Sequence, residues 1–217
     1  MNATKILGEP DKKKGIMADI IIVFFLALFF FSSLIIFGVL QANIDLALSV
    51  IVFIFLFILR IFLAILRRYK KSKNATKWTT LIHEYCHKIM ANKLGYNAQV
   101  ITNEKKLEVI KAKTGIDLNG YCKFSNNEEF KKRDFIIISL APFLFFIFMF
   151  ILLQCIQYFI AWILVKVIIS IISYMLIFRI EGCSNDIQMV IETRRVSENN
   201  KIMYSANRYR FVVYEKY

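Results

Sequence analysis

Histidine is scarce in this chain, with only two among 217 residues. The four cysteines form no CxxC pair, which argues against a zinc ribbon or a disulfide framework and favours packing roles for most of the thiols. Internal repeats, low-complexity linkers and glycine-rich phosphate loops are absent as well. Without a helix-turn-helix or RNA-binding signature, we expect no nucleic acid among the partners, although the formal net charge is +13.

Apolar residues are abundant instead. The chain is 58% hydrophobic and holds 21 phenylalanines, which is too apolar for an ordinary soluble domain of this size. Its basic residues lie between and after long apolar runs, where they are better explained as topology signals and contacts with anionic lipid. We therefore expect a mainly α membrane protein with membrane lipid among its partners.

Four apolar segments are predicted to cross the membrane, since a helix of about 20 apolar residues spans a bilayer. The run 135–178 is long enough to cross twice, so we divide it at a turn near residues 154–157. The first segment exceeds the apolar region of a secretory signal, and we expect it to be retained. The predicted membrane helices are residues 20–40, 46–66, 135–153 and 158–178.

Three residues interrupt these helices. Pro142 is expected to kink the third helix. Arg60 lies near the end of the second helix, where its side chain can reach the interface along its own stem. Lys166 is expected near mid-membrane, facing protein, water or a partner. Charges of this kind leave open a third interpretation of the chain, a small transporter.

Charge bias predicts the orientation. Lys and Arg are in excess in residues 1–15, 67–134 and 179–217, whereas the connections 41–45 and 154–158 hold none. By the positive-inside rule, both termini and the long loop are cytoplasmic. The chain is therefore predicted to have four parts. These are a first membrane helix pair (residues 1–68), a cytoplasmic insert (69–134), a second membrane helix pair (135–180) and a cytoplasmic C-terminal segment (181–217).

Both histidines belong to the insert, in the sequence His83-Glu84-Tyr85-Cys86-His87, which reads His-Glu-x-x-His. On a helix, residues four apart project from one face, so the two imidazoles can share a metal ion. Neutral imidazole is a common zinc ligand, and a glutamate beside the first histidine is placed to act on water at the metal. The alternative is an exposed helix in which Glu84 and Lys88 form an ion pair four residues apart.

A helix is predicted over Lys77–Leu94, because apolar residues recur there at helical spacing and Gly95 supplies a C-terminal stop. Short strands are predicted after it, at Gln99–Thr102 and Leu107–Ala112, with a hairpin around Asn119-Gly120. Such a small sheet either captures an extended peptide along its edge or only covers the helix.

With no third histidine, a third protein ligand must be Asp, Glu or Cys. Only groups on the cytoplasmic side can reach His83 and His87, and Asp186, just beyond the last membrane helix, is the first choice. Glu108 is the main rival, because soluble zincins often take a glutamate from about that distance along the chain. Glu181 and Cys183 remain further alternatives.

With these residues in place, the chain resembles the membrane-bound zincin peptidase family, related in layout to site-2-protease-like metallopeptidases. The likeness covers about residues 75–190: the His-Glu-x-x-His sequence with Gly95 after it, Ala141-Pro142 in the third helix, and Ser184-Asn185-Asp186-Ile187 after the fourth. It implies zinc bound by His83, His87 and Asp186, with Glu84 as catalytic base. Lys88 departs from the family pattern. The layout is also similar to four-helix membrane peptidases of the heat-shock type, which would favour Glu181.

The expected function is therefore that of an integral-membrane zinc metallopeptidase, a multi-pass protein of the cell membrane with its active site on the cytoplasmic face. Its substrate would be a peptide or a membrane protein, and Tyr121 or Asn185 could assist at the oxyanion. The main alternative is a non-catalytic membrane protein that binds zinc structurally, or a degenerate peptidase scaffold.

Overall fold

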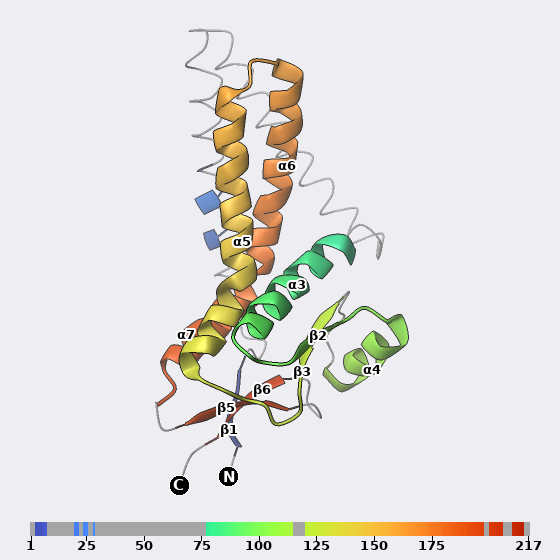
Figure 1. Cartoon of the computed structure of the whole chain (residues 1–217), viewed down its shortest axis with the longest axis vertical. Coiled ribbons are helices and arrows are strands. Elements are labelled where there is room, and N and C mark those ends of the chain that lie inside the picture. Colours follow the sequence, from blue (N-terminus) through green and yellow to red (C-terminus); the bar gives the residue numbers. More distant parts are fainter. Residues whose placement is uncertain are drawn as a thin grey trace. The chain divides into compact units, whose positions relative to one another are not determined.

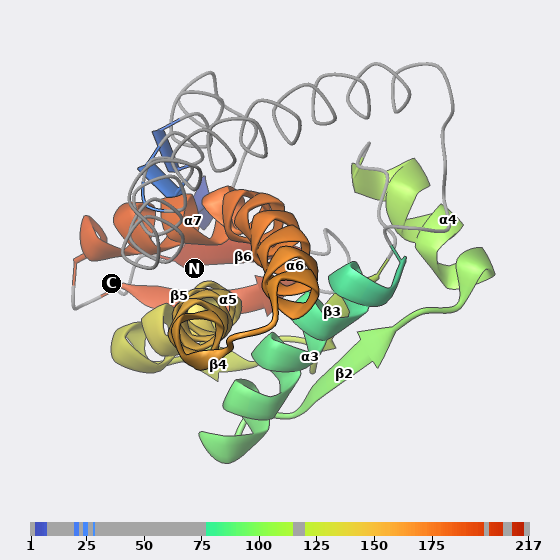
Figure 2. The same cartoon turned by 90° about the horizontal axis from the view of Figure 1, so that it is seen from above.

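The structure is a computed structural model that describes residues 3–7, 20–21, 24–25, 28, 77–114, 120–197, 200–205 and 210–214. The chain divides into two compact units. The first, called the sheet unit here, comprises residues 1–15, 73–145 and 183–217, and the second, the helical unit, comprises residues 16–72 and 146–182. Over the described residues the protein is mainly α-helical, as expected, and it has two small sheets (Figures 1 and 2).

Helix α3, Lys77–Lys93, carries the His-Glu-x-x-His sequence and confirms the predicted helix. It ends as predicted at Gly95, whose φ of +88° lies in the left-handed region that glycine adopts freely. The Gly95 N–H donates to the Asn92 carbonyl and the Tyr96 N–H to the Ala91 carbonyl, which satisfies the last carbonyls of the helix in a Schellman motif. The exit of the chain from α3 is thereby fixed.

A four-stranded antiparallel sheet collects distant parts of the chain in the order β1-β6-β5-β4. The bounds are Ala3–Ile6 for β1, Glu129–Phe130 for β4, Lys201–Ser205 for β5 and Arg210–Tyr214 for β6. β1, near the N-terminus, thus pairs with β6, near the C-terminus (Figure 1), and β4 of the insert pairs with β5. The N-terminal segment, the insert and the C-terminal segment therefore contribute strands to one sheet.

Aromatic side chains fill the core of the sheet unit. The buried rings of Phe124 and Phe130 lie edge to face at 5.1 Å, and Phe135 and Phe211 do so at 4.7 Å. The Tyr96 ring stacks on Phe130, and its hydroxyl donates a 2.8 Å hydrogen bond to Asp134. The residue that follows the α3 cap is therefore tied to the first turn of the next long helix.

The second sheet has two antiparallel strands, β2 (Ala98–Ile101) and β3 (Tyr121–Phe124). The first confirms the strand predicted at 99–102. β3 pairs with β2, from which α4 separates it in sequence, and the first half of the hairpin predicted around Asn119-Gly120 falls on residues that the structure does not describe. Residues 115–119 lie outside the described part of the chain.

Helix α4, Glu104–Thr114, replaces the strand predicted at Leu107–Ala112. The Asn103 side chain accepts a 3.0 Å hydrogen bond from the Lys105 N–H, which makes Asn103 the N-cap of this helix. Leu107 and Ile110 are buried three residues apart, as on one helix face. With a period of two, Leu107, Glu108, Val109 and Ile110 resemble a strand instead.

Two long apolar helices follow, α5 (Lys132–Phe159) and α6 (Ile163–Gly182). Two helices were predicted here, and Pro142 lies inside the first as expected. The predicted turn at 154–157 is wrong, since the connection is at 160–162 and those residues belong to α5. Among the described residues, α5 alone is long and apolar enough to cross a membrane, whereas α6 contains a shorter apolar stretch, Leu164–Ile177.

The position expected for Lys166 is also corrected. It lies in the first turn of α6 rather than in the middle of a membrane helix, and its side chain is 3% exposed. The buried Gln157 side-chain amide donates hydrogen bonds to the Lys166 carbonyl and to the Ser170 hydroxyl. The predicted helices at 20–40 and 46–66, and Arg60 with them, lie almost wholly outside the described residues. Four membrane helices are therefore not supported, and one candidate is.

Candidate metal centre

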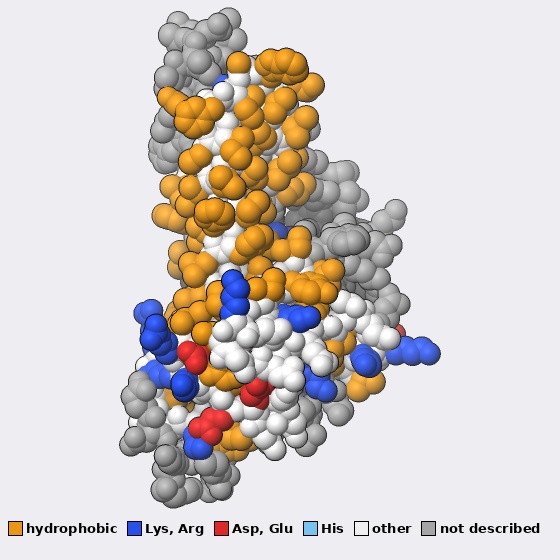
Figure 3. Space-filling view, in the orientation of Figure 1, with side chains coloured by type: hydrophobic (Ala, Val, Ile, Leu, Met, Phe, Trp, Pro, Cys, Tyr) orange, Lys and Arg blue, Asp and Glu red, His pale blue; other side chains and the backbone are white. Residues whose placement is uncertain are grey.

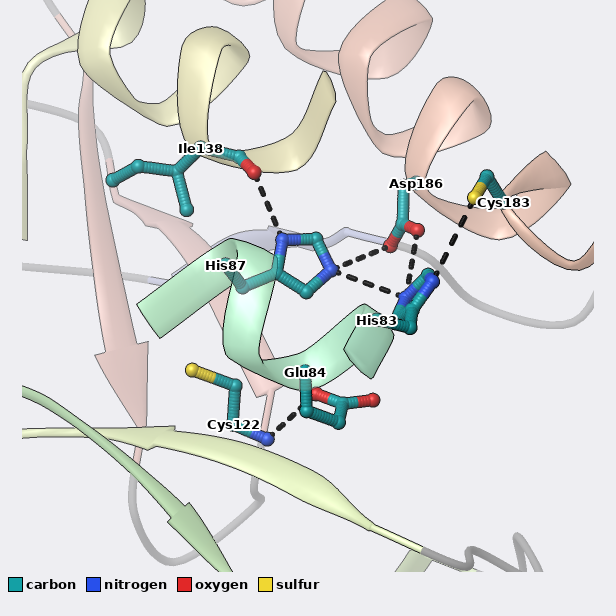
Figure 4. A network of polar contacts seen from close by, with 7 residues as sticks. All are labelled: His83, Glu84, His87, Cys122, Ile138, Cys183 and Asp186. Carbon is teal, nitrogen blue, oxygen red and sulfur yellow. Dashed lines mark hydrogen bonds and ion pairs between the residues drawn. The ribbon is translucent and has the colours of Figure 1, made fainter. Parts of the chain in front are cut away.

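His83 and His87 lie on one face of α3, and their Nε2 atoms are 3.2 Å apart (Figure 4). His87 is buried and His83 is half-buried. A close approach of two ring nitrogens is unfavourable when both are acceptors or both are donors, unless a proton or a cation lies between them. The i,i+4 spacing thus produces the paired arrangement predicted from the sequence.

Asp186 comes to this pair from α7, Ser184–Arg194. Its Oδ2 lies 3.2 Å from His83 Nε2, and its Oδ1 lies 3.6 Å from His87 Nε2. The carboxylate is 5% exposed and sits in the first turn of α7, where the positive end of the helix dipole favours negative charge. Oδ2 is buried without a hydrogen bond of good geometry, although it faces a ring nitrogen.

The spacing of these atoms suits a small cation. Zinc binds histidine nitrogen and carboxylate oxygen at about 2.0–2.2 Å, so the ligand atoms of a tetrahedral site lie about 3.3–3.6 Å apart. The three separations found here are 3.2, 3.2 and 3.6 Å. The two Asp186 distances involve different oxygens of one carboxylate, so the donor set could hold a divalent ion such as zinc through one or both of these oxygens.

The outer nitrogen of each ring also has a partner. His87 Nδ1 donates a 2.8 Å hydrogen bond to the Ile138 carbonyl in α5, which fixes the tautomer that leaves Nε2 free to ligate. His83 Nδ1 lies 3.6 Å from Sγ of the buried Cys183. Both imidazoles are thus held from behind, as is usual for histidines that bind a metal.

A second ligand combination shares two of the same residues. His83, Cys183 and Asp186 each offer a ligand atom, all lie within 4.8 Å of one another, and this group could bind a metal ion. In the part of the chain that the structure describes, this group and the His83–His87–Asp186 cluster overlap, and no third group stands apart from them. Every candidate arrangement therefore centres on His83 and Asp186.

Glu84 projects from the neighbouring position on α3 toward β3. Its Oε2 accepts a 2.8 Å hydrogen bond from the Cys122 N–H, as Figure 4 shows. Gly120 also lies near Glu84, because a Cβ added there would lie 3.4 Å from Glu84 Cγ. The glutamate is therefore enclosed between its own helix and the strand that follows Gly120.

The electrostatics of the site are strongly coupled. Burial raises the pKa of the Glu84 carboxyl, against the opposing effects of His87 and His83. Burial also acts to raise the pKa of Asp186, but the imidazoles of His87 and His83 outweigh it and hold that pKa well below its usual range. For His87 burial acts to lower the pKa, and the adjacent Asp186 carboxylate reverses this and raises it.

Of the predicted site residues, the structure brings His83, His87 and Asp186 into contact, whereas the Glu84 carboxylate accepts a hydrogen bond from the Cys122 N–H instead. The structure does not bring Glu108 there, because that residue is exposed on α4 and joins no ligand group among the described residues. Glu181 lies in α6, with its side chain outside what the structure describes. Asn185 is exposed, and the Tyr121 hydroxyl donates to Tyr204.

Sequence reasoning missed the backbone partners of the site. The Ile138 carbonyl contacts His87, and the Cys122 N–H contacts Glu84. Almost every residue carries a backbone N–H and a carbonyl, so no sequence signal marks these partners.

Comparisons with protein-family models, with curated proteins and with solved structures find no match to this chain. The resemblance to membrane-bound zincin peptidases therefore stays a prediction.

Proposed function

We propose that this protein is an integral-membrane zinc metallopeptidase that hydrolyses a peptide bond at the cytoplasmic membrane face. His83, His87 and Asp186 would hold the zinc ion, and Glu84 would be the general base. The observation that carries the proposal is the convergence of His83 Nε2, His87 Nε2 and the Asp186 carboxylate at 3.2–3.6 Å. Two ring nitrogens and a buried carboxylate from segments about 100 residues apart converge in this way to share a cation.

A zinc ion with three protein ligands supplies Lewis-acid chemistry, because it polarises a carbonyl and lowers the pKa of a water molecule. Glu84 would accept the proton of the attacking water at its carboxylate and later deliver it to the leaving amine nitrogen. The burial that raises the pKa of Glu84 supports this role, since a general base works best when its pKa lies near the working pH.

The membrane assignment rests on α5. Its 28 residues correspond to about 42 Å of helix, enough to cross a bilayer core. Phe148 is 62% exposed in the middle of α5, and Tyr158, Phe159 and Trp162 are exposed around its end, as in an aromatic belt at a membrane surface. Figure 3 shows hydrophobic side chains over the visible face of α5 and α6.

The strand pairing in the sheet unit supports an even number of membrane crossings between the paired segments of the chain. A bilayer cannot divide a hydrogen-bonded sheet, so β1, β4 and β6 must lie on one side of any membrane. This requirement agrees with four helices, namely α5, α6 and the predicted helices at 20–40 and 46–66. The excess of Lys and Arg in the shared segments supports the cytoplasmic side.

A second candidate is a non-catalytic membrane protein that binds the metal structurally. The observation in its favour is the Cys122–Glu84 hydrogen bond, which engages one carboxylate oxygen with the backbone rather than with the histidines. A metal site with a purely structural role needs no carboxylate that is free to act as a general base. Apo positions of catalytic groups often change on binding substrate, so this contact alone does not decide between the two.

The two candidates are separated by measuring metal and hydrolysis together. Purified wild type, Glu84→Gln and Asp186→Ala proteins would be analysed for metal by mass spectrometry and incubated with a complex peptide library. We expect zinc in the wild type and in Glu84→Gln, hydrolysis only in the wild type, and neither property in Asp186→Ala. Loss of a general base lowers rates by about 10²–10⁴-fold. Cleavage by Glu84→Gln at the wild-type rate would refute the proposed role of Glu84, and zinc-loaded wild type without cleavage would favour the structural site.

A further inference from the structure

Helix α3 has an apolar face that the sheet unit leaves uncovered. Ile82, Tyr85 and Ile89 are 42%, 42% and 53% exposed. We call these three residues the outer stripe of α3. At about 100° per residue they fall within about 60° of one another around the helix, and roughly 150° from the centre of the His83–His87 face. The helix therefore has a metal-binding face and, nearly opposite, an apolar face.

The position of α3 along the axis of α5 indicates what covers the outer stripe. Charged residues of α5 are confined to its first turn, Lys132–Asp134, and no charge follows up to Phe159. The His87–Ile138 hydrogen bond fixes α3 against α5 only four residues beyond Asp134, about 6 Å along the axis. Interfacial amphipathic helices lie about 5–10 Å into the boundary between headgroups and acyl chains.

Side chains around the stripe suit the same surroundings. The Lys88 ammonium lies 5.5 Å from the centre of the Tyr85 ring, and Lys93 is exposed in the last turn of α3. A lysine with an apolar stem beside an aromatic ring is well placed to reach lipid phosphates. On α5 in the same unit, Leu144 and Phe145 are exposed as well, so the helix that can cross the bilayer also presents apolar side chains outward.

We propose that the outer stripe of α3 is a membrane-contact surface that lies in the headgroup–acyl boundary of the bilayer. The metal-binding face of the same helix is then held at the level of the membrane surface, about one helix diameter from lipid. This inference goes beyond the proposed function. It depends on α5 crossing the membrane, but neither on the metal nor on hydrolysis.

The test places a fluorescent side chain on the stripe. Tyr85→Trp would be made in a Trp78→Phe, Trp162→Phe background and reconstituted in vesicles of phosphatidylcholine and phosphatidylglycerol, brominated either near the headgroup or near the chain end. Phe148→Trp, at an exposed position of α5, reports whether that helix lies within the bilayer. Gln99→Trp, at an exposed position of β2, reports the aqueous side. The zinc content of each variant is measured separately, so that the metal site is judged independently.

We expect bromine near the headgroup to quench Tyr85→Trp by roughly half, bromine at the chain end to quench Phe148→Trp most, and neither to quench Gln99→Trp. Quenching of Phe148→Trp without quenching of Tyr85→Trp would overturn the inference and leave the membrane span intact. Quenching of neither would overturn both. A Tyr85→Trp protein shielded from bromolipid and from aqueous acrylamide alike would show that another protein covers the stripe, which also overturns the inference.

Discussion

Cys183 Sγ lies 3.6 Å from Nδ1 of His83, whereas Asp186 contacts Nε2 of the same ring. The two nitrogens of an imidazole point to opposite sides, so a single ion cannot bind Nε2 beside Asp186 and also take Cys183 in the ring orientation found. Ligation by Cys183 would use the His83–Cys183–Asp186 set, without the pair of Nε2 atoms. In the present arrangement the thiol acts on the outer nitrogen, which makes it a positioning group for the ring.

This geometry predicts different effects for two substitutions. We expect His87→Ala to abolish stoichiometric zinc binding, because it removes an atom that faces both His83 and Asp186. Cys183→Ala should retain zinc with an affinity lower by about 10–100-fold, the usual cost of losing an outer partner of a ligand. Competition with a chromophoric chelator measures both affinities. The reverse order, zinc lost in Cys183→Ala and kept in His87→Ala, would establish the His83–Cys183–Asp186 set instead.

Zinc binding should also release protons in a pH-dependent way. Burial favours the neutral imidazole of His87, but Asp186 outweighs it and raises the pKa of His87 to about 9 in the metal-free protein. A metal ligand must be deprotonated. Binding at pH 7 therefore displaces about one proton, so the apparent affinity rises with pH and levels off above about 9. Titration calorimetry in buffers of different ionisation enthalpy measures this release, and heats that do not depend on the buffer would contradict it.

The cluster of His83, His87 and Asp186 was largely predictable, because these residues have a spacing and a chemistry that the sequence displays. His83 and His87 are paired by the helical repeat alone. Asp186 required a further argument, namely that the chain returns to the same side after α6, and its carboxylate does lie beside both rings. Glu108 was a rival only by its distance along the chain, which carries no information on where α4 points.

The fold was predictable where local signals agreed and not where they competed. Gly95 marked the end of α3 because few residues other than glycine accept its φ of +88°. In α4 the order of Leu107, Glu108, Val109 and Ile110 suggests a strand. The segment is a helix, and the signal for it in the sequence is Asn103, a residue type that favours the N-cap position. The turn at 160–162 contains neither Gly nor Pro, so nothing local marked its position. Pairing of β1 with β6 joins opposite ends of the chain, and no local pattern encodes it.

The contact between Gly120 and Glu84 gives a test of positioning. A Cβ at residue 120 would lie 3.4 Å from Glu84 Cγ and 3.6 Å from Thr80 Cγ2, which is ordinary contact, so Gly120→Ala should behave as wild type. The larger Gly120→Val side chain must displace the glutamate. Because misplacement by about 1 Å costs on the order of 10²-fold in rate, we expect that variant to keep its zinc and lose most hydrolysis. Equal rates in both variants would show that the position of Glu84 does not limit catalysis.

The pairing of β4 with β5 connects the site to membrane topology. Glu129 and Phe130 of the insert pair with Met203 and Ile202 of the C-terminal segment, so in the proposed topology both segments must lie on the side of the membrane where His83 and Asp186 meet. The connection at 41–45 is predicted to lie on the opposite side, because it follows a single membrane helix. Ser125 and Ser197 are exposed and can report the two segments of the sheet unit.

Single-cysteine labelling tests this arrangement in a background with all four native cysteines replaced by alanine. We expect a membrane-impermeant thiol reagent to modify Ala42→Cys in intact cells, and to modify Ser125→Cys and Ser197→Cys only after the membrane is permeabilised. Detergent-solubilised protein is the control for reactivity at each position. Labelling of Ser197→Cys but not Ser125→Cys from outside would place the C-terminal segment across the bilayer from His83. A carboxylate there could not come within the roughly 2.0–2.2 Å that a zinc ligand requires, so Asp186 could not belong to the site.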